Sequence, residues 1–309
     1  MGMDPASLPL TLSVALTTFH LDVGAAALIV GACFAYCWAW RRCDTAHRHY
    51  LWWFAIAVLL VIAATMSMVA VYATVLFWVR ALQVLILLYV APFFLAMGRP
   101  VTVVTRGFGL TDRAEKVLAK RFSRVVLHPA TTSAAMLSTP WLLYLTPWYT
   151  AALRHVPVGY ATEVMQLAIG FVYFYARLQT DPVPRRYTQL ISLVISIVES
   201  LGDGLLGIVL WLGPLIAVDY YTHIDRQWGP SMRVDQSIGA GVLWILGDVL
   251  GGGFIVVLMR LFSADEKGHA LVVDAELDRV ESETAAEAAP ASGLWWESDP
   301  QMRDRIRRR

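Results

Sequence analysis

The chain has 309 residues, of which 57% are hydrophobic and only 16% carry a charge, and its mean hydropathy is +0.55. These values lie outside the range of soluble globular domains and therefore indicate an integral membrane protein. The formal net charge is only +1. The charges are nevertheless unevenly distributed along the chain, and their positions carry more information than their sum.

Seven apolar stretches of the sequence each have the length that a transmembrane helix needs. They cover residues 22–40, 51–73, 75–97, 131–153, 158–176, 190–217 and 234–262. Because a bilayer offers no water to pair with backbone groups, segments of this kind must be helical. The sequence therefore predicts an all-α fold, a polytopic membrane protein with a seven-transmembrane-helix bundle across residues 22–262.

The positions of Lys and Arg predict how this bundle is oriented. If the N-terminus lies outside, 21 of the 25 Lys and Arg fall on the inner side, in the inner loops and the C-terminal tail. Inner loops of membrane proteins carry such an excess, so we predict an N-out, C-in orientation. Arg177 then belongs to the third inner loop, and Arg80 is the one cation inside a helix.

The two ends of the chain are predicted to lie outside the bundle. Residues 1–21 form an extracytoplasmic segment, and because no Lys or Arg precedes their apolar part, we expect no removable signal peptide. Residues 263–309 lack apolar periodicity and are predicted to be a flexible cytoplasmic tail. A short basic run beside a membrane favours contact with anionic lipid, so we predict no nucleic-acid partner.

Residues 107–126 form the one sizeable insertion between the predicted helices. Asp112 and Glu115 resemble the start of a capped short helix. The apolar side chains fall on one stripe and the basic side chains on other faces, a pattern typical of an amphipathic helix at a membrane surface. We therefore expect this segment to lie on the anionic inner leaflet of the lipid bilayer.

Five charged side chains lie well inside the apolar stretches, away from their ends, and Gln83 lies among them. The charged residues are Arg80, Glu163, Glu199, Asp203 and Asp248. Each charge costs at least about 2.5 kcal/mol in a bilayer unless it finds a partner. We therefore expect these side chains to face the interior and to converge on one centre, in which Arg80 is the only cation. Two interpretations stay open: an ion network that fixes helix register, or a site for a metal, a proton or a partner.

A second set of residues, in the predicted outer half, has the chemistry of soft metal ligands. The set consists of His20, Met66, Met68 and Met165. Thioether and imidazole groups together suit Cu(I), so copper is the cofactor that this set would bind. Ordinary packing is the alternative role of its methionines. Since no nucleophile–base set, zinc-protease motif or phosphate-binding loop is recognisable, we predict that the protein is not an enzyme.

Several short motifs follow one another along the chain. They are residues 67–77 (SMVAVYATVLF), 91–100 (APFFLAMGRP), 127–129 (LHP), 144–153 (YLTPWYTAAL), 180–182 (TDP), 228–230 (WGP) and 235–244 (DQSIGAGVLW). Their order resembles that of the CtaG-type cytochrome c oxidase assembly factors. The resemblance implies a seven-helix bundle in the bacterial plasma membrane, which helps to mature the copper-containing oxidase and contacts oxidase subunits.

The chain departs from this family where the resemblance implies intramembrane histidines. On the third predicted helix the family carries two histidines around a glutamine, whereas here Arg80 and Val84 flank Gln83. The other family histidines fall at Gly159, Glu163, Met165 and Asp203. We therefore regard the chain as a divergent member, in which Arg80, Glu163 and Asp203 refill an ancestral metal cavity and the guanidinium replaces the charge of the metal.

The sequence thus predicts a non-enzymatic membrane assembly factor for cytochrome c oxidase, with copper delivery as one form of that role. One alternative is a metal-free membrane scaffold that binds an oxidase subunit or lipid. The other is an ion or proton pathway, because intramembrane carboxylates commonly mark such routes. The carboxylates concerned are Glu163, Glu199, Asp203 and Asp248.

Overall fold

The structure is a computed structural model that describes residues 9–44, 47–184, 189–256, 259–260 and 273–280. It divides the chain into two units, Met1–Val256 and Val257–Arg309. Within the described residues every regular element is a helix, and the one β-type contact is an isolated bridge between Phe19 and Ser67. In the second unit residues 273–280 are helical, and most of the predicted tail lies outside the described residues.

The helices of the first unit are short at the ends of the bundle and long across it. They are α1 Leu12–Thr17, α2 Val23–Arg42, α3 Arg48–Met66, α4 Met68–Tyr72, α5 Phe77–Leu85, the π-helical turn η1 Ile86–Val90, α6 Ala91–Met97, α7 Pro100–Gly107, α8 Thr111–Leu118, α9 Arg121–Val126, α10 Pro129–Leu145, α11 Trp148–Arg154, α12 Val156–Leu178, α13 Gln189–Leu212, α14 Val218–Ile224, α15 Met232–Gly241 and η2 Val242–Leu246. Residues 247–256 continue η2 as α-helix.

Five helical segments of the described residues are long and apolar enough to cross a membrane, and each coincides with a predicted span. They are Val23–Arg42, Arg48–Met66, Phe77–Met97, Val194–Leu212 and Met232–Val256. The fourth and fifth predicted spans correspond to α10 with α11 and to α12. Of these, α10 has only 17 residues, and α12 carries Glu163 and Arg177. The count of seven and the N-out orientation therefore stay predictions.

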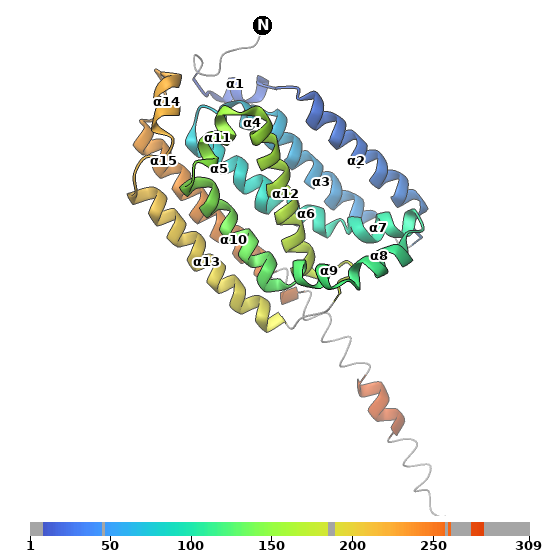
Figure 1. Cartoon of the computed structure of the whole chain (residues 1–309). Coiled ribbons are helices and arrows are strands. Elements are labelled where there is room, and N and C mark those ends of the chain that lie inside the picture. Colours follow the sequence, from blue (N-terminus) through green and yellow to red (C-terminus); the bar gives the residue numbers. More distant parts are fainter. Residues whose placement is uncertain (1–8, 45–46, 185–188, 257–258, 261–272, 281–309) are drawn as a thin grey trace, which may run out of the picture. The chain divides into compact units, whose positions relative to one another are not determined.

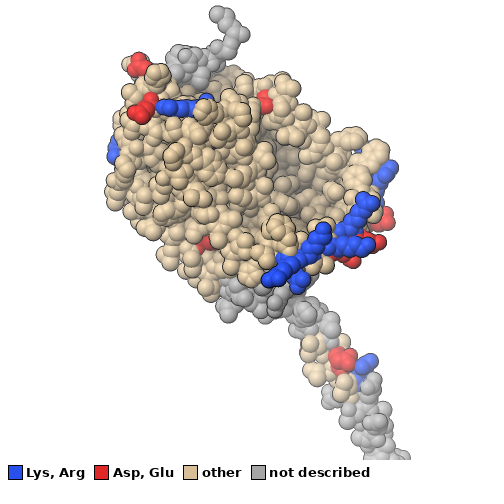
Figure 2. Space-filling view, in the orientation of Figure 1, with Lys and Arg blue, Asp and Glu red and all other residues tan. Residues whose placement is uncertain are grey.

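The distribution of charge on the first unit fits a protein that crosses a bilayer. Figure 2 shows Lys, Arg, Asp and Glu mostly near the two ends of the visible face, with few charged side chains between them. Large apolar side chains are exposed along the long helices, such as Phe34 on α2 and Leu201 on α13. Contact with hydrocarbon accounts for a surface of this kind, because water would not stabilise it.

The segment Phe77–Met97, which joins α5, η1 and α6, lies at the centre of the bundle (Figure 1). In its most apolar window 61% of the residues are buried, against 28% or less in the other four spans. It packs against α3, α12 and α15, whereas α2 lies at one edge beside α3 and α7. Polar groups of the central helix must therefore find their partners inside the protein.

The central helix widens into the π-helical turn η1 directly before Pro92. Because proline has no N–H group, the carbonyl of Leu88 loses the partner that it would have four residues further on. Gly170 of α12 meets this point, since a Cβ added there would lie 2.1 Å from the Leu88 carbonyl oxygen and 2.6 Å from Pro92. Only glycine lets the two backbones approach this closely, so the contact fixes how α12 packs on the central helix.

Two helices begin without a side-chain cap of their own and receive one from a distant segment. Asp235 of α15 caps α5, because its carboxylate accepts hydrogen bonds from the N–H groups of Phe77 at 3.1 Å and Trp78 at 3.0 Å. Asp181 caps α7 by accepting from the N–H of Thr102 at 3.0 Å. Burial raises the pKa of the Asp181 carboxyl, and its bonds with Thr102 oppose that rise. Both caps pair backbone donors that a helix start leaves open.

The second predicted span, residues 51–73, is not one continuous helix. It is broken at Ser67, whose backbone is extended, so that α3 ends at Met66 and α4 starts at Met68. The hydroxyl of Ser67 donates to the carbonyl of Ala63, a group that the end of α3 leaves without a helical partner. Apolar periodicity does not show this break, because both halves of the segment are equally apolar.

The insertion at residues 107–126 also differs from its prediction. It forms two short helices, α8 and α9, rather than one. The expected capping box is wrong, since α8 is preceded by Leu110, which makes no side-chain hydrogen bond. Asp112 lies instead in the first turn of α8, where its charge interacts favourably with the positive end of the helix.

We expect Gly170→Ala to lower the thermal unfolding midpoint of the purified protein in detergent, because the new methyl group would overlap the Leu88 carbonyl. Overpacking of this kind costs about 1–3 kcal/mol. Gly251→Ala is the matched control, since nothing lies within 4 Å of a Cβ added at that helical position. Equal midpoints for the two variants would contradict the role assigned to Gly170.

Candidate functional site

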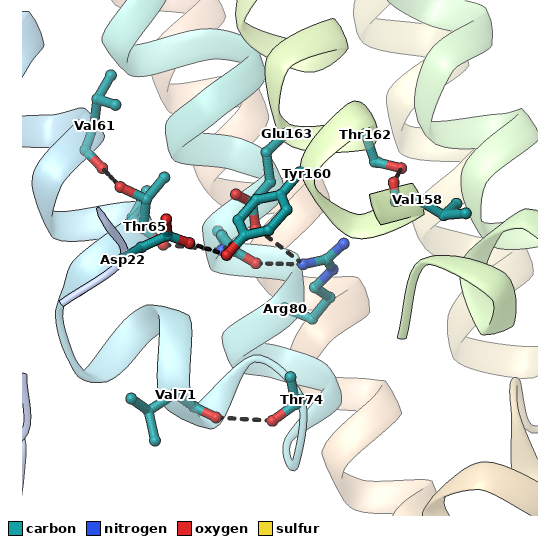
Figure 3. Close-up of polar contacts among 12 residues, drawn as sticks. Asp22, Val61, Thr65, Val71, Thr74, Arg80, Val158, Tyr160, Thr162 and Glu163 are labelled. Atoms are coloured by element: carbon teal, nitrogen blue, oxygen red, sulfur yellow. Dashed lines mark hydrogen bonds and ion pairs between the residues drawn. The ribbon is translucent and has the colours of Figure 1, made fainter. Parts of the chain in front are cut away.

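Arg80 is carried by α5 inside the bundle and is only 4% exposed. Its Nη1 donates a hydrogen bond of 2.6 Å to Oε1 of Gln83 and lies 3.7 Å from Oε1 of Glu163 on α12. Figure 3 shows Arg80 and Glu163 reaching toward each other from their two helices. One nitrogen of the guanidinium thus has a strong acceptor on its own helix and an ion-pair partner on a neighbouring one.

Gln83 joins this pair to a third helix. Its Nε2 donates to Oε1 of Glu163 at 3.1 Å and to the backbone carbonyl of Ala64 at 2.9 Å. Ala64 lies in the last turn of α3, where carbonyl groups lack helical partners. Arg80, Gln83 and Glu163 together form the Arg80 centre, which links α3, the central helix and α12.

In the part of the chain that the structure describes, several hydrogen-bond donors are buried without a partner at the Arg80 centre and on a tyrosine of the same bundle. Nε and Nη2 of Arg80 and the hydroxyl of Tyr144 are buried and have no hydrogen-bond partner among the described residues. Burial raises the pKa of Tyr221 on α14. The positive charge of Arg80 acts in the opposite direction and lowers that pKa. A fixed guanidinium with spare N–H and O–H donors can hold an acceptor group or an anion, but it repels a metal cation.

A second buried ion pair lies elsewhere in the bundle. Arg177, near the end of α12, is fully buried, and its Nη1 lies 3.4 Å from Oε2 of Glu199 on α13. Its Nη2 donates to Oγ of Ser196 at 2.6 Å, and the hydroxyl of Tyr173 donates to Glu199 at 2.7 Å. Glu199 therefore has a cation and a hydroxyl donor as partners, neither of which belongs to the Arg80 centre.

This second pair overturns two expectations. Arg177 does not lie in a loop, and Arg80 is not the only cation available to the buried carboxylates. The physical reason is that α12 runs to Leu178, two residues past its predicted end, and stops only where Gln179 adopts left-handed backbone with φ of 49°. The last turn of α12 therefore carries the guanidinium into the bundle.

The remaining predicted carboxylates have neutral partners. The hydroxyl of Tyr89, on the central helix, donates to Oδ2 of Asp203 at 3.1 Å. The hydroxyl of Ser200 donates to Oδ1 of Asp248 at 2.7 Å. Within the described part of the chain no direct contact joins Asp203 to Arg80. The six predicted polar residues therefore form separate groups of contacts and do not converge on the one centre that the sequence had led us to expect.

The predicted copper ligands lie partly together. The backbone N–H of His20 donates a hydrogen bond of 2.8 Å to the backbone carbonyl of Met66. Met68 follows Met66 across the break at Ser67. Met66 is buried and Met68 packs beside Val69 and other residues of α4, whereas Met165 lies on α12. Among the described residues no group of three or more His, Cys, Asp or Glu is placed to hold a metal ion.

The sequence did not identify the polar residues that tie the loops to the helices. Gln236 donates from Nε2 to the carbonyls of Leu210 at 2.7 Å and Pro214 at 3.0 Å, which closes the end of α13. Its neighbour Asp235 caps α5, and Asp181 caps α7. For the two aspartates the sequence did offer a signal, because they lie in the motifs at residues 180–182 and 235–244. A motif carboxylate outside a helix interior is a candidate helix cap.

Residues 34–264 match the family described as cytochrome c oxidase caa3 assembly factor, Caa3_CtaG. The chain belongs to this family. The resemblance seen in the motifs is therefore confirmed over about three quarters of the sequence. The description of the family names the assembly of cytochrome c oxidase caa3.

Three mycobacterial relatives are also similar to this Caa3_CtaG chain. The uncharacterized proteins Mb0105 of Mycobacterium bovis and MT0111 of Mycobacterium tuberculosis are each 25% identical over 224 residues, which cover 69% of this chain and 34% of the relative. The uncharacterized protein ML1998 of Mycobacterium leprae is 23% identical over 238 residues, which cover 73% and 36%. The chain thus spans about a third of the length of these relatives. No solved structure matches it.

The burial of Arg177 can be tested by replacement with methionine, which keeps the length of the side chain but removes its charge. Breaking a buried ion pair leaves the other charge without a partner and costs about 3–5 kcal/mol, so we expect Arg177→Met to lower the thermal unfolding midpoint strongly. Arg113→Met removes an exposed charge from α8 and serves as the control. If Arg177 lay in a solvated loop, the two variants would unfold at the same temperature.

Proposed function

We propose that this Caa3_CtaG protein is a non-enzymatic scaffold in cytochrome c oxidase assembly and that it holds no metal at the Arg80 centre. The placement of Arg80 is the observation that carries the proposal. Where the family resemblance implies a histidine, a buried guanidinium is held by Gln83 and Glu163. A fixed cation opposes the binding of a second cation nearby, and most strongly where little water screens it. The centre is therefore suited to hold helices together and unsuited to carry copper.

A scaffold also needs a fixed surface for its partner, and the α14 end of the bundle offers one. A cavity of about 220 Å³ lies between α14 and the start of α15. Its lining includes Phe77, Tyr221, Asp225, Arg226 and Gln236, so it combines two aromatic side chains with charged and amide groups. A few placed polar groups around a small cavity suit the recognition of a polar protein segment. We propose that an oxidase subunit docks at this end.

Copper delivery is a second candidate form of the same role, and one observation favours it. The backbone bond between His20 and Met66 brings two predicted ligands to the end of α3, where Met68 follows directly. Thioether and imidazole groups bind Cu(I), which would then be the cargo of the assembly reaction. Such cargo would be held by these side chains and not by the Arg80 centre.

Purification of the tagged full chain from bacterial membranes distinguishes the two forms. We expect oxidase subunits to co-purify equally well with the wild-type chain and with Met66→Leu/Met68→Leu/Met165→Leu, because docking does not need the thioethers. Copper measured in the same preparations, after anaerobic loading with Cu(I), should stay well below one equivalent. Met259→Leu, which changes an exposed methionine outside the predicted set, is the control.

A full equivalent of copper in the wild-type chain and in Met259→Leu, lost only in the triple variant, would contradict the metal-free form and support delivery. Wild-type preparations without oxidase subunits, even after chemical crosslinking in the membrane, would contradict docking itself. The two measurements therefore test separate parts of the proposal.

A further inference from the structure

The short helices α8 and α9 present apolar and basic side chains side by side on the surface. Phe122 is 76% exposed, Val125 55% and Val117 52%. The basic side chains of the same segment are also exposed, and they are Arg113, Lys116, Lys120, Arg121 and Arg124. Figure 2 shows them as a band of blue over α8 and α9. An amphipathic segment of this composition is stable when its apolar side chains enter the lipid at the headgroup boundary.

A cavity of about 440 Å³ opens directly beside this surface, between α9 and the start of α10. Arg121 and Arg124 line it from α9, and His128 and Thr131 line it from the start of α10. Among the described residues that line it there is no Asp or Glu, so its charge is uniformly positive or neutral. Its volume lies in the usual range for small-molecule sites, about 300–1,000 Å³.

The chemistry of this lining points to phosphate. A guanidinium presents N–H donors in a planar fork that matches two oxygens of a phosphate group, and two guanidinium groups can share one phosphate. The positive end of the dipole of α10, a helix of 17 residues, lies on the same side, and it acts as a field rather than through free donors, because Pro129 has no N–H and His128 accepts the N–H of Ala130. The cavity therefore favours a phosphate-bearing anion over an apolar ligand.

The position of the cavity favours phosphate that belongs to a lipid. The cavity lies where α10 begins, at the end of the bundle; Val125 lines it together with the arginines, and Phe122 is exposed on the same short helix, α9. Basic pockets beside helix ends at the membrane surface are suited to lipid headgroups. A soluble phosphate compound would use the arginines but not the exposed apolar side chains.

We propose that the cavity between α9 and α10 binds the headgroup phosphate of an anionic phospholipid of the surrounding bilayer. Arg121 and Arg124 hold the phosphate, and Phe122 and Val125 lie along the acyl chains of the same lipid. This inference goes beyond the oxidase role, because the site needs no oxidase subunit. It also names a specific site for the lipid, in addition to general attraction between basic residues and an anionic surface.

Native mass spectrometry of the purified full chain, incubated with phosphatidylglycerol or phosphatidylcholine, tests this site. The variant Arg121→Gln/Arg124→Gln removes both guanidinium groups from the lining of the cavity. The control Arg113→Gln/Lys116→Gln removes the same number of charges from α8, outside the cavity lining. We expect the wild-type chain to retain phosphatidylglycerol over phosphatidylcholine. Two lost charge-assisted hydrogen bonds should make the affinity of the cavity variant for phosphatidylglycerol at least about tenfold weaker than that of the control.

Equal losses in the two double variants would mean diffuse surface attraction and would overturn the proposal. Displacement of phosphatidylglycerol by an excess of inorganic phosphate would show that the cavity takes free phosphate, which would also overturn it. The substituted side chains are exposed, so unchanged unfolding midpoints in detergent should confirm that the variants fold. Phe122→Ser leaves both arginines in place and should still weaken retention of phosphatidylglycerol; undiminished retention in that variant would overturn the assigned acyl contact.

Discussion

An ionised group can stay inside a bilayer only if the protein supplies its partners, and this constraint governs the centre of the bundle. Arg80 contacts an amide and a carboxylate, and the amide of Gln83 also pairs the carbonyl that the end of α3 leaves open at Ala64. The side chain of Gln83 therefore accepts a hydrogen bond from the buried guanidinium and donates one to the open carbonyl at the end of α3. Because these partners come from α3, the central helix and α12, pairing them also fixes the register of the three helices.

The same constraint explains why several carboxylates lie at helix starts. Asp235 pairs the open N–H groups of α5, and Asp181 pairs one of α7. Asp22 caps its own helix, α2, and also accepts the hydroxyl of Tyr160 on α12. The bonds of Asp235 and Asp181, and that of Asp22 with Tyr160, each join a helix end to a segment far away in the sequence. Two of the three carboxylates belong to the motifs that carry the Caa3_CtaG resemblance, which gives those motifs a structural role whether or not the protein handles copper.

The sequence predicted the long helices well, because a bilayer leaves an apolar stretch few alternatives to a helix. The central helix Phe77–Met97 was expected at residues 75–97, and the contact between Arg80 and Glu163 was expected from the cost of each charge together with the positions of the family histidines. Arg177 was missed because counting charges by loop does not show how far a helix continues. Asp203 was grouped with Arg80 because spacing along one helix does not show which neighbour it faces. The helix caps that distant segments supply could not be derived, since apolar periodicity identifies buried faces but does not identify partners from distant segments.

The central claim is that Arg80 and Glu163 stabilise the bundle as a pair. A double-mutant cycle with Arg80→Met, Glu163→Gln and their combination, measured as free energies of unfolding in one detergent, tests this directly. The account predicts a coupling within the range of about 0.5–3 kcal/mol that is usual for side chains in contact, with the double variant more stable than the sum of the single losses implies. A parallel cycle of Arg80→Met with Asp219→Asn, an exposed carboxylate on α14, should be additive. Additive effects of Arg80→Met and Glu163→Gln would contradict the account.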